Sequence, residues 1–355
     1  MDIEISCCMI VKNEEAVLAR CLDSIKNIVD ELIIVDTGST DTTKQIAYQY
    51  TDKVYDYQWE DDFSKARNFA FDQATKDYLF WIDADDVIDE SNRQAFIDLK
   101  HTMDETIDIL MMRYQIDENY IYYRERLLKR EQGYRWENPV HEVIALKGNI
   151  QYSDITIHHK KIRVEDRKRN LKIYEKKLSE GYQLNTRELF YYARELYFNQ
   201  YDEQAIRSFQ EFIAMEDAWV ENKIEACLNM ADCYRHLGKK DESYLSLINS
   251  FKYDLPRAEI LCELGYYFLN QEAYQQAIYW YEQALLLTPN FYSGAFIRKD
   301  CYDFLPAIQL CICYNAINDR KRAVWYNELA GRFKPNNELV LANRQYFFEH
   351  PESQI

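Results

Sequence analysis

Three carboxylates at the end of a short apolar segment are the side chains in this chain best suited to chemistry. Residues 78–82 are mostly large and apolar, which predicts a strand buried on both faces, and Asp83, Asp85 and Asp86 follow it directly. Side chains alternate along a strand, so Asp83 and Asp85 are expected to point the same way. Two oxygen ligands in this arrangement suit Mg²⁺ or Mn²⁺, which commonly shares its ligand shell with substrate phosphates.

A second interpretation of these carboxylates stays open at this point. Acidic turns are common, and Asp86 or Asp89 could cap the helix that follows. The metal interpretation has support from position, because open α/β sheets bind their ligands at the carboxyl ends of the strands.

The composition of the 355-residue chain narrows the classes of function. The formal net charge of −17 disfavours binding to nucleic acid and to anionic lipid surfaces. No apolar run approaches the length of a membrane span, and residues 1–4 lack the basic start of a signal peptide. The nine cysteines show no zinc-ligand spacing. We therefore expect a cytoplasmic protein of two or three domains with reduced, packed thiols.

The first half of the chain alternates apolar strand segments with amphipathic helices. The predicted strands are 3–12, 31–35, 54–56 and 78–82, and the predicted helices between them are 17–25, 44–50 and 62–75. This order predicts an α/β domain with a doubly wound, mostly parallel sheet. The sequence has neither a Gly-x-Gly-x-x-Gly turn nor a Gly-x-x-x-x-Gly-Lys loop, so a metal would have to hold any phosphates.

Four motifs follow one another in the first hundred residues. They are Ile-Val-Lys-Asn-Glu at 10–14, Val-Asp-Thr-Gly-Ser-Thr-Asp at 35–41, Phe-Ser-Lys-Ala-Arg-Asn at 63–68 and Asp-Ala-Asp-Asp at 83–86. In this order they resemble the family 2 glycosyltransferases. The resemblance implies the GT-A fold, a nucleotide-sugar donor, a divalent metal and, for most members, inversion at the sugar carbon.

The resemblance also implies roles for individual residues. Those implied in binding the nucleotide sugar are Asn13, Glu14, Asp36, Thr37, Arg67, Asp83, Ala84 and Arg126. Asp85, together with Asp83, would bind the metal that bridges the donor diphosphate. Thr37 stands where many members have a second Asp that contacts uracil, so the resemblance does not imply strict selectivity for uridine. The simpler alternatives are a surface charge for Arg67 and a helix cap for Asn13.

A second group of polar residues follows a buried strand expected at 107–112 and an antiparallel edge pair expected at 120–123. An inverting transfer needs a general base near the acceptor and positive charge near the leaving diphosphate. Glu142 is the first candidate for the base and His141 is the second.

The Val-His-Glu segment at 140–142 extends the resemblance to one subgroup of the family. This subgroup includes the bacterial peptide S-glycosyltransferases of the sublancin type and some surface-saccharide glucosyltransferases. In it His159 aligns with a histidine that can complete the metal shell, and Arg126 with the arginine of an Arg-x-Phe segment. Two departures are Leu128 in place of Phe and the absence of a Gly-Tyr pair after His159, so a structural role for His159 stays open.

The second half of the chain repeats a helical pattern with a period of roughly 34–38 residues, as in tetratricopeptide arrays. The clearest unit spans 258–289, and three others fall around residues 193–209, 231–247 and 311–335. We therefore predict a GT-A catalytic domain at 1–165, a helical connector at 166–184 and an all-α repeat domain at 185–355. Such arrays bind peptides or proteins, or associate with themselves.

Together these resemblances imply a bacterial, metal-dependent inverting enzyme. It would move a hexose from a UDP-sugar, with UDP-glucose favoured, to a protein or peptide acceptor that the repeat domain recognises, unless that domain mediates a homo-oligomer instead. Two alternatives stay open: an acceptor that is a surface polysaccharide or a lipid-linked saccharide, and a non-catalytic repeat scaffold.

Overall fold

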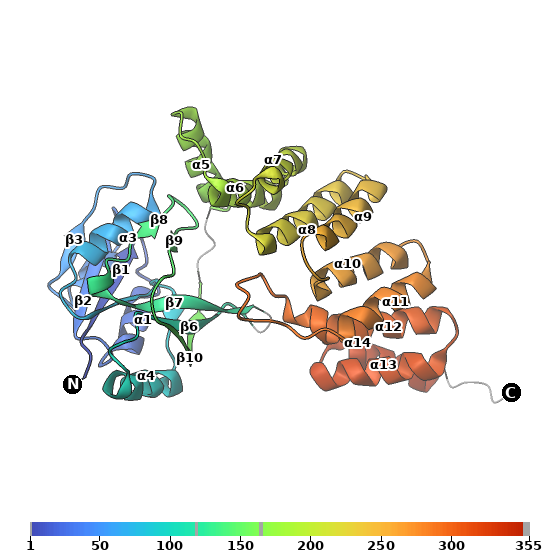
Figure 1. Ribbon diagram of the computed structural model, residues 1–355. Helices are drawn as coiled ribbons and strands as arrows, with labels where there is room; N and C mark the ends of the chain where they lie inside the picture. Colours follow the sequence, from blue (N-terminus) through green and yellow to red (C-terminus); the bar gives the residue numbers. More distant parts are fainter. Residues whose placement is uncertain (1, 118–119, 163–165, 351–355) are drawn as a thin grey trace. The chain divides into compact units, whose positions relative to one another are not determined.

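The structure is a computed structural model that describes residues 2–117, 120–162 and 166–350. The chain divides into two compact units, Met1–Tyr191 and Tyr192–Ile355 (Figure 1). The first unit is an α/β domain and the second consists of helices. The predicted domain limits at 165 and 184 stay predictions.

An eight-stranded, mostly parallel sheet forms the centre of the first unit, which confirms the predicted α/β class of the GT-A type. Its strands are β1 (Ile5–Val11), β2 (Glu31–Asp36), β3 (Val54–Asp56), β4 (Tyr78–Trp81), β5 (Asp86–Val87), β6 (Ile109–Gln115), β7 (Ile121–Lys129) and β10 (Ile150–His159). Their order is β3-β2-β1-β4-β7-β6-β10-β5. A separate two-stranded ribbon joins β8 (Trp136–Glu137) to β9 (Val143–Ile144).

Strand β7 corrects one expectation about this sheet. The segment 120–123 was expected at an edge, but β7 continues to Lys129 and lies between β4 and β6, antiparallel to both. The physical reason is burial on both faces, since residues 125–128 are all buried. The segment therefore supplies a central strand and brings Arg124 and Arg126 next to the end of β4.

The helices of this unit are α1 (Leu18–Ile25), α2 (Thr43–Ala47), α3 (Phe63–Asp72), α4 (Glu90–Thr102) and α5 (Arg169–Ser179). Apolar side chains fill both faces of the sheet: Cys7 belongs to the core cluster that includes α1, whereas Cys8 belongs to the cluster that includes residues of α3. Neighbouring residues of a strand point to opposite faces, so β1 contributes to two cores. The cysteines are buried free thiols, as predicted.

Strand register brings the sequence motifs to one edge of the sheet. In the parallel pair β1–β2, Val11 lies opposite Asp36, so the first two motifs end side by side. Strand β4 pairs with the other side of β1. Strand β10 runs antiparallel to β5 with His159 opposite Asp86. This last pairing carries a histidine from late in the domain to the acidic turn.

The second unit consists of antiparallel helical hairpins, which confirms the predicted all-α repeat class. Helix α6 (Thr186–Phe198) crosses the division between the units and is followed by α7 (Asp202–Ala214), α8 (Val220–His236), α9 (Lys240–Asn249), α10 (Ala258–Leu269), α11 (Tyr274–Leu285), α12 (Phe304–Ala316), α13 (Arg320–Phe333) and α14 (Glu338–Glu349). Close crossing explains the glycine of the clearest repeat, since a Cβ on Gly265 would lie 2.6 Å from the ring of Tyr281. Within the described residues, no helix combines the length and apolar character needed to cross a membrane.

Candidate active site

The motifs predicted from the sequence line one cavity of about 790 Å³ in the first unit. The predicted site residues that line it are Asn13, Glu14, Thr37, Arg67, Asp83, Ala84, Asp85, His141, Glu142 and His159. Two predicted residues lie elsewhere: Asp36 is buried beside Thr37, and Arg126 is fully buried behind the acidic turn. Arg124, two residues before Arg126 on β7, lines the cavity instead.

The three carboxylates stand on a turn rather than on a continuing strand. Strand β4 ends at Trp81, and the N–H of Asp86 donates to the carbonyl of Asp83 at 3.0 Å. The alternation that predicted a shared face therefore stops before the carboxylates begin. As a result, the three side chains differ in their partners: Asp83 binds Arg67, Asp86 binds Arg126, and His159 lies near both Asp85 and Asp86.

Asp83 belongs to a group that we call the arginine cluster, which comprises Arg67, Asp83 and Glu142. From α3, the Nη2 of Arg67 lies 2.8 Å from Asp83 Oδ1 and its Nε lies 2.7 Å from Glu142 Oε1. The guanidinium also lies near the rings of Trp81 and Trp136, at 5.2 and 5.0 Å from their centroids. Arg67 is thus a buried cross-link and not the surface charge considered as its alternative.

The charges within the arginine cluster stabilise one another. Burial opposes the charge of Asp83, but Arg67 and Arg126 outweigh burial and hold the pKa of Asp83 below its ordinary value of 3.8. Burial also opposes the charge of Arg67, yet Asp83 and Glu142 raise the pKa of that guanidinium above its ordinary range. Asp83 and Arg67 therefore stay ionised at neutral pH.

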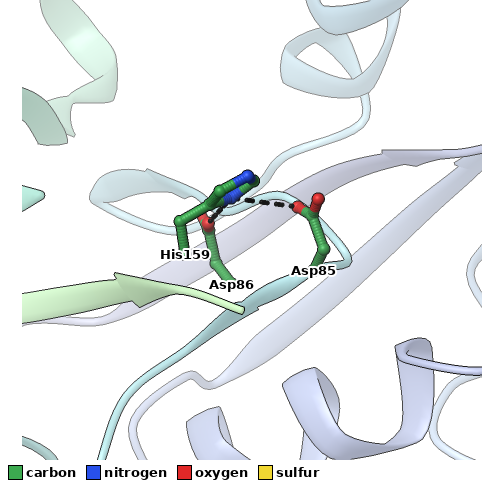
Figure 2. A group of neighbouring side chains, drawn as sticks. All are labelled: Asp85, Asp86 and His159. Carbon is green, nitrogen blue, oxygen red and sulfur yellow. Dashed lines mark hydrogen bonds and ion pairs between the residues drawn. The ribbon is translucent and has the colours of Figure 1, made fainter. Parts of the chain in front are cut away.

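Asp85 belongs to a second group, the histidine cluster, which comprises Asp85, Asp86 and His159 (Figure 2). One ligand atom from each residue lies within 4.8 Å of the others, a spacing that could hold a metal ion. The Nδ1 of His159 lies 3.6 Å from Asp85 Oδ1 and 3.3 Å from Asp86 Oδ1. The sequence suggests only a helix cap for Asp86, whereas the cap of α4 is Asp89, which accepts from the N–H of Asn92.

The pKa of Asp85 is shifted in the opposite direction to that of Asp83 in the arginine cluster. Burial is the main cause that raises the pKa of Asp85, and the charges of Asp83 and Asp86 raise it further against an opposing effect of His159. The hydrogen bond to Asp86 is the main cause that raises the pKa of His159, although burial opposes it. A cation next to Asp85 would offset the burial and the repulsion by Asp83 and Asp86 that together raise the pKa of Asp85.

Sequence comparison places this site in a known family. Residues 6–170 match the family model described as glycosyl transferase family 2. The chain carries a glycosyltransferase family 2 domain. The match confirms the family that the four motifs predicted, and it covers every predicted site residue.

Three curated relatives align with parts of the chain. A TPR repeat-containing protein of Synechococcus elongatus is 37% identical over 145 residues, which cover 40% of this chain and 35% of the relative. The SPbeta prophage-derived glycosyltransferase SunS of Bacillus subtilis is 29% identical over 221 residues, 57% of this chain and 51% of the relative. The lipopolysaccharide core biosynthesis glycosyltransferase LpsC of Rhizobium meliloti is 31% identical over 159 residues, 41% of this chain and 58% of the relative. Each alignment thus spans less than two thirds of the relative.

The first two motifs of the family 2 domain form the wall of the cavity where β1 and β2 end. Asp36 Oδ2 accepts from the backbone N–H groups of Gly38 and Ser39 at 3.1 and 3.0 Å, which shapes the turn after β2. Asn13 Oδ1 accepts from the N–H of Thr40 at 2.7 Å and so ties the two motifs together. The second oxygen of Asp36, Oδ1, is buried with no hydrogen-bond partner among the described residues. Direct contact of these residues with a nucleoside stays a prediction.

His141 and Glu142 also line the cavity. His141 adopts a backbone φ of +52°, which is uncommon for a residue other than glycine. Its ring stacks on Tyr191 with the centroids 4.3 Å apart and an interplanar angle of 16°. Glu142 meets Arg67 on the neighbouring side. The structure thus brings both predicted base candidates into the cavity.

Helix α5 supplies a basic wall that the sequence had indicated only as a charged connector. Arg169, Lys172 and Lys176 are spaced three and four residues apart and all line the cavity. Lys172 pairs with Asp166 at 2.7 Å, and Arg169 lies 4.8 Å from the ring of Phe63. The i, i+3, i+7 spacing of the cations was the available signal, but nothing in the local pattern indicated that this face of the helix lines the site.

Proposed function

We propose that the family 2 domain transfers a hexose, with inversion, from a UDP-sugar to an acceptor in a reaction that requires Mn²⁺ or Mg²⁺. The observation that carries this proposal is the contrast among the three carboxylates after β4. Asp83 and Asp86 each bind an arginine, whereas Asp85 faces His159 and has a raised pKa. Asp85 is therefore the carboxylate with most to gain from an added cation.

The donor set fits a divalent metal. Carboxylate oxygen and imidazole nitrogen are ligands that Mn²⁺ accepts, and the spacing within the histidine cluster suits one ion. Asp85 and His159 would hold the ion, and Asp83 remains the additional ligand that family resemblance implies. When bound, such an ion supplies positive charge to a leaving diphosphate.

The residues around the cavity can perform the remaining tasks. Arg67 and Arg124 place two guanidinium groups on the cavity wall, where each can donate hydrogen bonds to phosphate oxygens. Glu142 accepts the proton of the acceptor hydroxyl or thiol as the new bond to the sugar carbon forms and the bond to UDP breaks. His141, adjacent in the chain and on the same wall, is the second candidate for this base.

The proposed donor and acceptor follow from the resemblance of one short segment. UDP-glucose is favoured as donor, and a protein or peptide as acceptor, because the Val-His-Glu segment resembles the sublancin-type subgroup. The repeat unit would then recognise that acceptor or join copies of the chain. The similarity to LpsC favours a second candidate, a saccharide acceptor, since the name of that relative refers to lipopolysaccharide core biosynthesis.

A binding experiment tests the proposal before any acceptor is known. Purified full-length protein is titrated with UDP-glucose, UDP-galactose, UDP-N-acetylglucosamine and GDP-mannose by calorimetry, in Mn²⁺ and then in EDTA. We expect one UDP-sugar to bind in Mn²⁺ and its affinity to fall in EDTA, with a matching rise in the melting temperature of the complex. If none of the four nucleotide sugars binds, the proposal is contradicted and the scaffold alternative is favoured.

A further inference from the structure

Asp86 is the most deeply buried of the three carboxylates, with no exposed surface. We propose that Asp86 is a positioning residue and not a metal ligand: together with Tyr114 it fixes the ring of His159 so that Nε2 is the nitrogen offered to the cation. This inference rests on the metal site of the proposed function. It distinguishes metal ligands from supporting residues within the histidine cluster, whose spacing alone does not separate them.

The first reason is that the oxygens of Asp86 are already committed. Oδ1 accepts from the hydroxyl of Tyr114 at 2.9 Å and lies 3.3 Å from His159 Nδ1. Oδ2 accepts from Arg126 Nη2 at 3.2 Å and from the backbone N–H of Asp83 at 3.3 Å. A carboxylate has about four acceptor positions, so these contacts use them. A cation could bind Asp86 only by displacing one of these buried partners.

The second reason is that Arg126 cannot readily release Asp86. Both side chains are 0% exposed. The guanidinium of Arg126 also donates from Nη1 to the carbonyl of Trp81 at 3.2 Å, and its Cζ lies 3.8 Å from the centroid of the Trp81 ring. A buried ion pair that loses one partner leaves a costly uncompensated charge. Asp86 is therefore held in place by Arg126, which explains why the predicted donor-binding arginine lies behind the site.

The third reason concerns the proton on His159. Nδ1 faces the hydroxyl oxygen of Tyr114 at 2.9 Å as well as Asp86 Oδ1. The single O–H of Tyr114 donates to Asp86 Oδ1, so the hydroxyl oxygen can only accept from the ring of His159. Nδ1 must then be the donor, which leaves the lone pair on Nε2. A metal-binding histidine commonly donates its other ring N–H to a carboxylate in this way.

Strand pairing and two further hydrogen bonds fix the position of His159 relative to Asp85, Asp86 and Tyr114. His159 pairs with Asp86 across the β10–β5 register, and Tyr114 lies on β6, which pairs with the other side of β10. The N–H of Lys160 donates to the carbonyl of Asp85 at 2.8 Å, and Arg20 Nη2 donates to the carbonyl of Lys160 at 2.6 Å. The ring of His159 is thus set by its strand and by two side chains behind it.

A double-mutant cycle on Mn²⁺ binding tests the division of roles. The full chain and its variants are titrated with Mn²⁺ alone, without nucleotide, and bound Mn²⁺ is measured by electron paramagnetic resonance. We expect Tyr114→Phe, which keeps the ring and the Asp86–Arg126 pair, to weaken Mn²⁺ binding about tenfold. In a His159→Ala background the same change should alter the affinity by less than about twofold, because its effect runs through His159.

Asp86→Asn is compared in the same two backgrounds. If Asp86 is a positioning residue, Asp86→Asn should lower the Mn²⁺ affinity in the wild-type background and change it little in the His159→Ala background. If Asp86 is a ligand, the same change should lower the Mn²⁺ affinity about tenfold in both backgrounds. Tyr122→Phe is the matched control, since Tyr122 packs edge-on against Tyr114 at 5.6 Å and should leave the affinity unchanged. The hyperfine coupling of Mn²⁺ to ¹⁵N-labelled imidazole should be present in the wild type, weaker in Tyr114→Phe and absent in His159→Ala.

The outcomes separate this inference from the proposed function. The positioning role would be overturned, while the metal site stands, if Tyr114→Phe and His159→Ala lower the Mn²⁺ affinity additively. It would also be overturned if Asp86→Asn lowers that affinity further in the His159→Ala background. A wild type that binds no Mn²⁺ would instead contradict the proposed metal site itself, and this inference with it.

Discussion

Two groups of charged residues, the arginine cluster and the histidine cluster, meet at the turn formed by residues 83–86. They differ in how the charge of their carboxylates is balanced. In the arginine cluster, Arg67 binds Asp83 and Glu142, and it lowers the pKa of Asp83. In the histidine cluster, Asp85 faces a histidine, and burial together with its neighbours raises its pKa. The difference teaches that three neighbouring carboxylates need not have one role: Arg67 and Arg126 bind Asp83 and Asp86, whereas the side chain of Asp85 pairs with no arginine among the described residues and is the carboxylate for which we propose an external cation.

The largest expected effect comes from breaking the histidine cluster. Asp85→Asn keeps the size of the side chain but removes its charge, so the leaving diphosphate would lose the cation that balances it. We expect the rate of UDP release from UDP-glucose in Mn²⁺ to fall by about 100-fold or more. A coupled assay for UDP measures this rate, and near wild-type turnover in Mn²⁺ would show that Asp85 does not hold the metal.

Removing the centre of the arginine cluster should cost stability as well as activity. Arg67→Met leaves Asp83 and Glu142 without their shared partner, and Arg67 itself is 9% exposed. We expect a loss of about 2–3 kcal/mol in the free energy of unfolding, below the full value for a buried pair because Asp83 is partly solvated. Urea denaturation of Arg67→Met and of the charge-conserving Arg67→Lys measures it. Equal stability of the wild type and Arg67→Met would refute the cross-link.

The two clusters predict opposite pH dependences in metal-free protein. The pKa of Asp83 is lowered, so its charge stabilises the fold above the ordinary value of 3.8, and this contribution is lost as the pH falls through the folded pKa. The pKa of Asp85 is raised, so ionising it costs stability as the pH rises from 3.8 through its folded pKa.

Substitution by Asn at each position measures these signs. In EDTA, the stability of each Asn variant should approach that of the wild type as the pH falls below the folded pKa of the carboxyl that is replaced. Toward pH 7 the two variants should diverge, Asp83→Asn becoming less stable than the wild type and Asp85→Asn more stable. Urea titrations across this range follow the divergence. Two variants that shift in the same direction would remove the electrostatic distinction between the clusters.

The smallest expected effect concerns Asp89, the acidic residue just beyond the turn. Its carboxylate caps α4 by accepting from the N–H of Asn92 at 2.9 Å, the role that the sequence had left open for Asp86 as well. Asp89→Ala should cost about 1 kcal/mol of stability and leave Mn²⁺ affinity unchanged. Thermal denaturation and Mn²⁺ titration on the same preparation measure both quantities. A loss of Mn²⁺ affinity would show that Asp89 contributes to the metal site as well as to the helix cap.

The sequence predicted what local patterns encode. Strands β1, β2 and β4 were found because runs of apolar residues mark buried strands, and the motifs after them meet because parallel strands end at one edge. Gly265 and Tyr281 likewise revealed the repeat, since close helix crossing demands a small residue opposite a large one.

Partners distant in the sequence were not predictable in this way. Arg126 was assigned to the donor because a motif aligned, but its place behind Asp86 follows from the central position of β7, which is set by pairing with β4 and β6. Tyr114 went unnoticed because its role depends on reaching Asp86 and His159 at once. Such contacts arise from strand register, which the local hydrophobic pattern does not specify between strands buried on both faces.

Thermal denaturation of the wild type and of Asp85→Asn, each in EDTA and in saturating Mn²⁺, tests the central claim most directly. If Asp85 is the carboxylate left for an external cation, the order of stability reverses: Asp85→Asn melts higher in EDTA, and the wild type melts higher in Mn²⁺. If Mn²⁺ raises both melting temperatures equally, or neither, Asp85 does not hold the cation and the division between the two clusters fails.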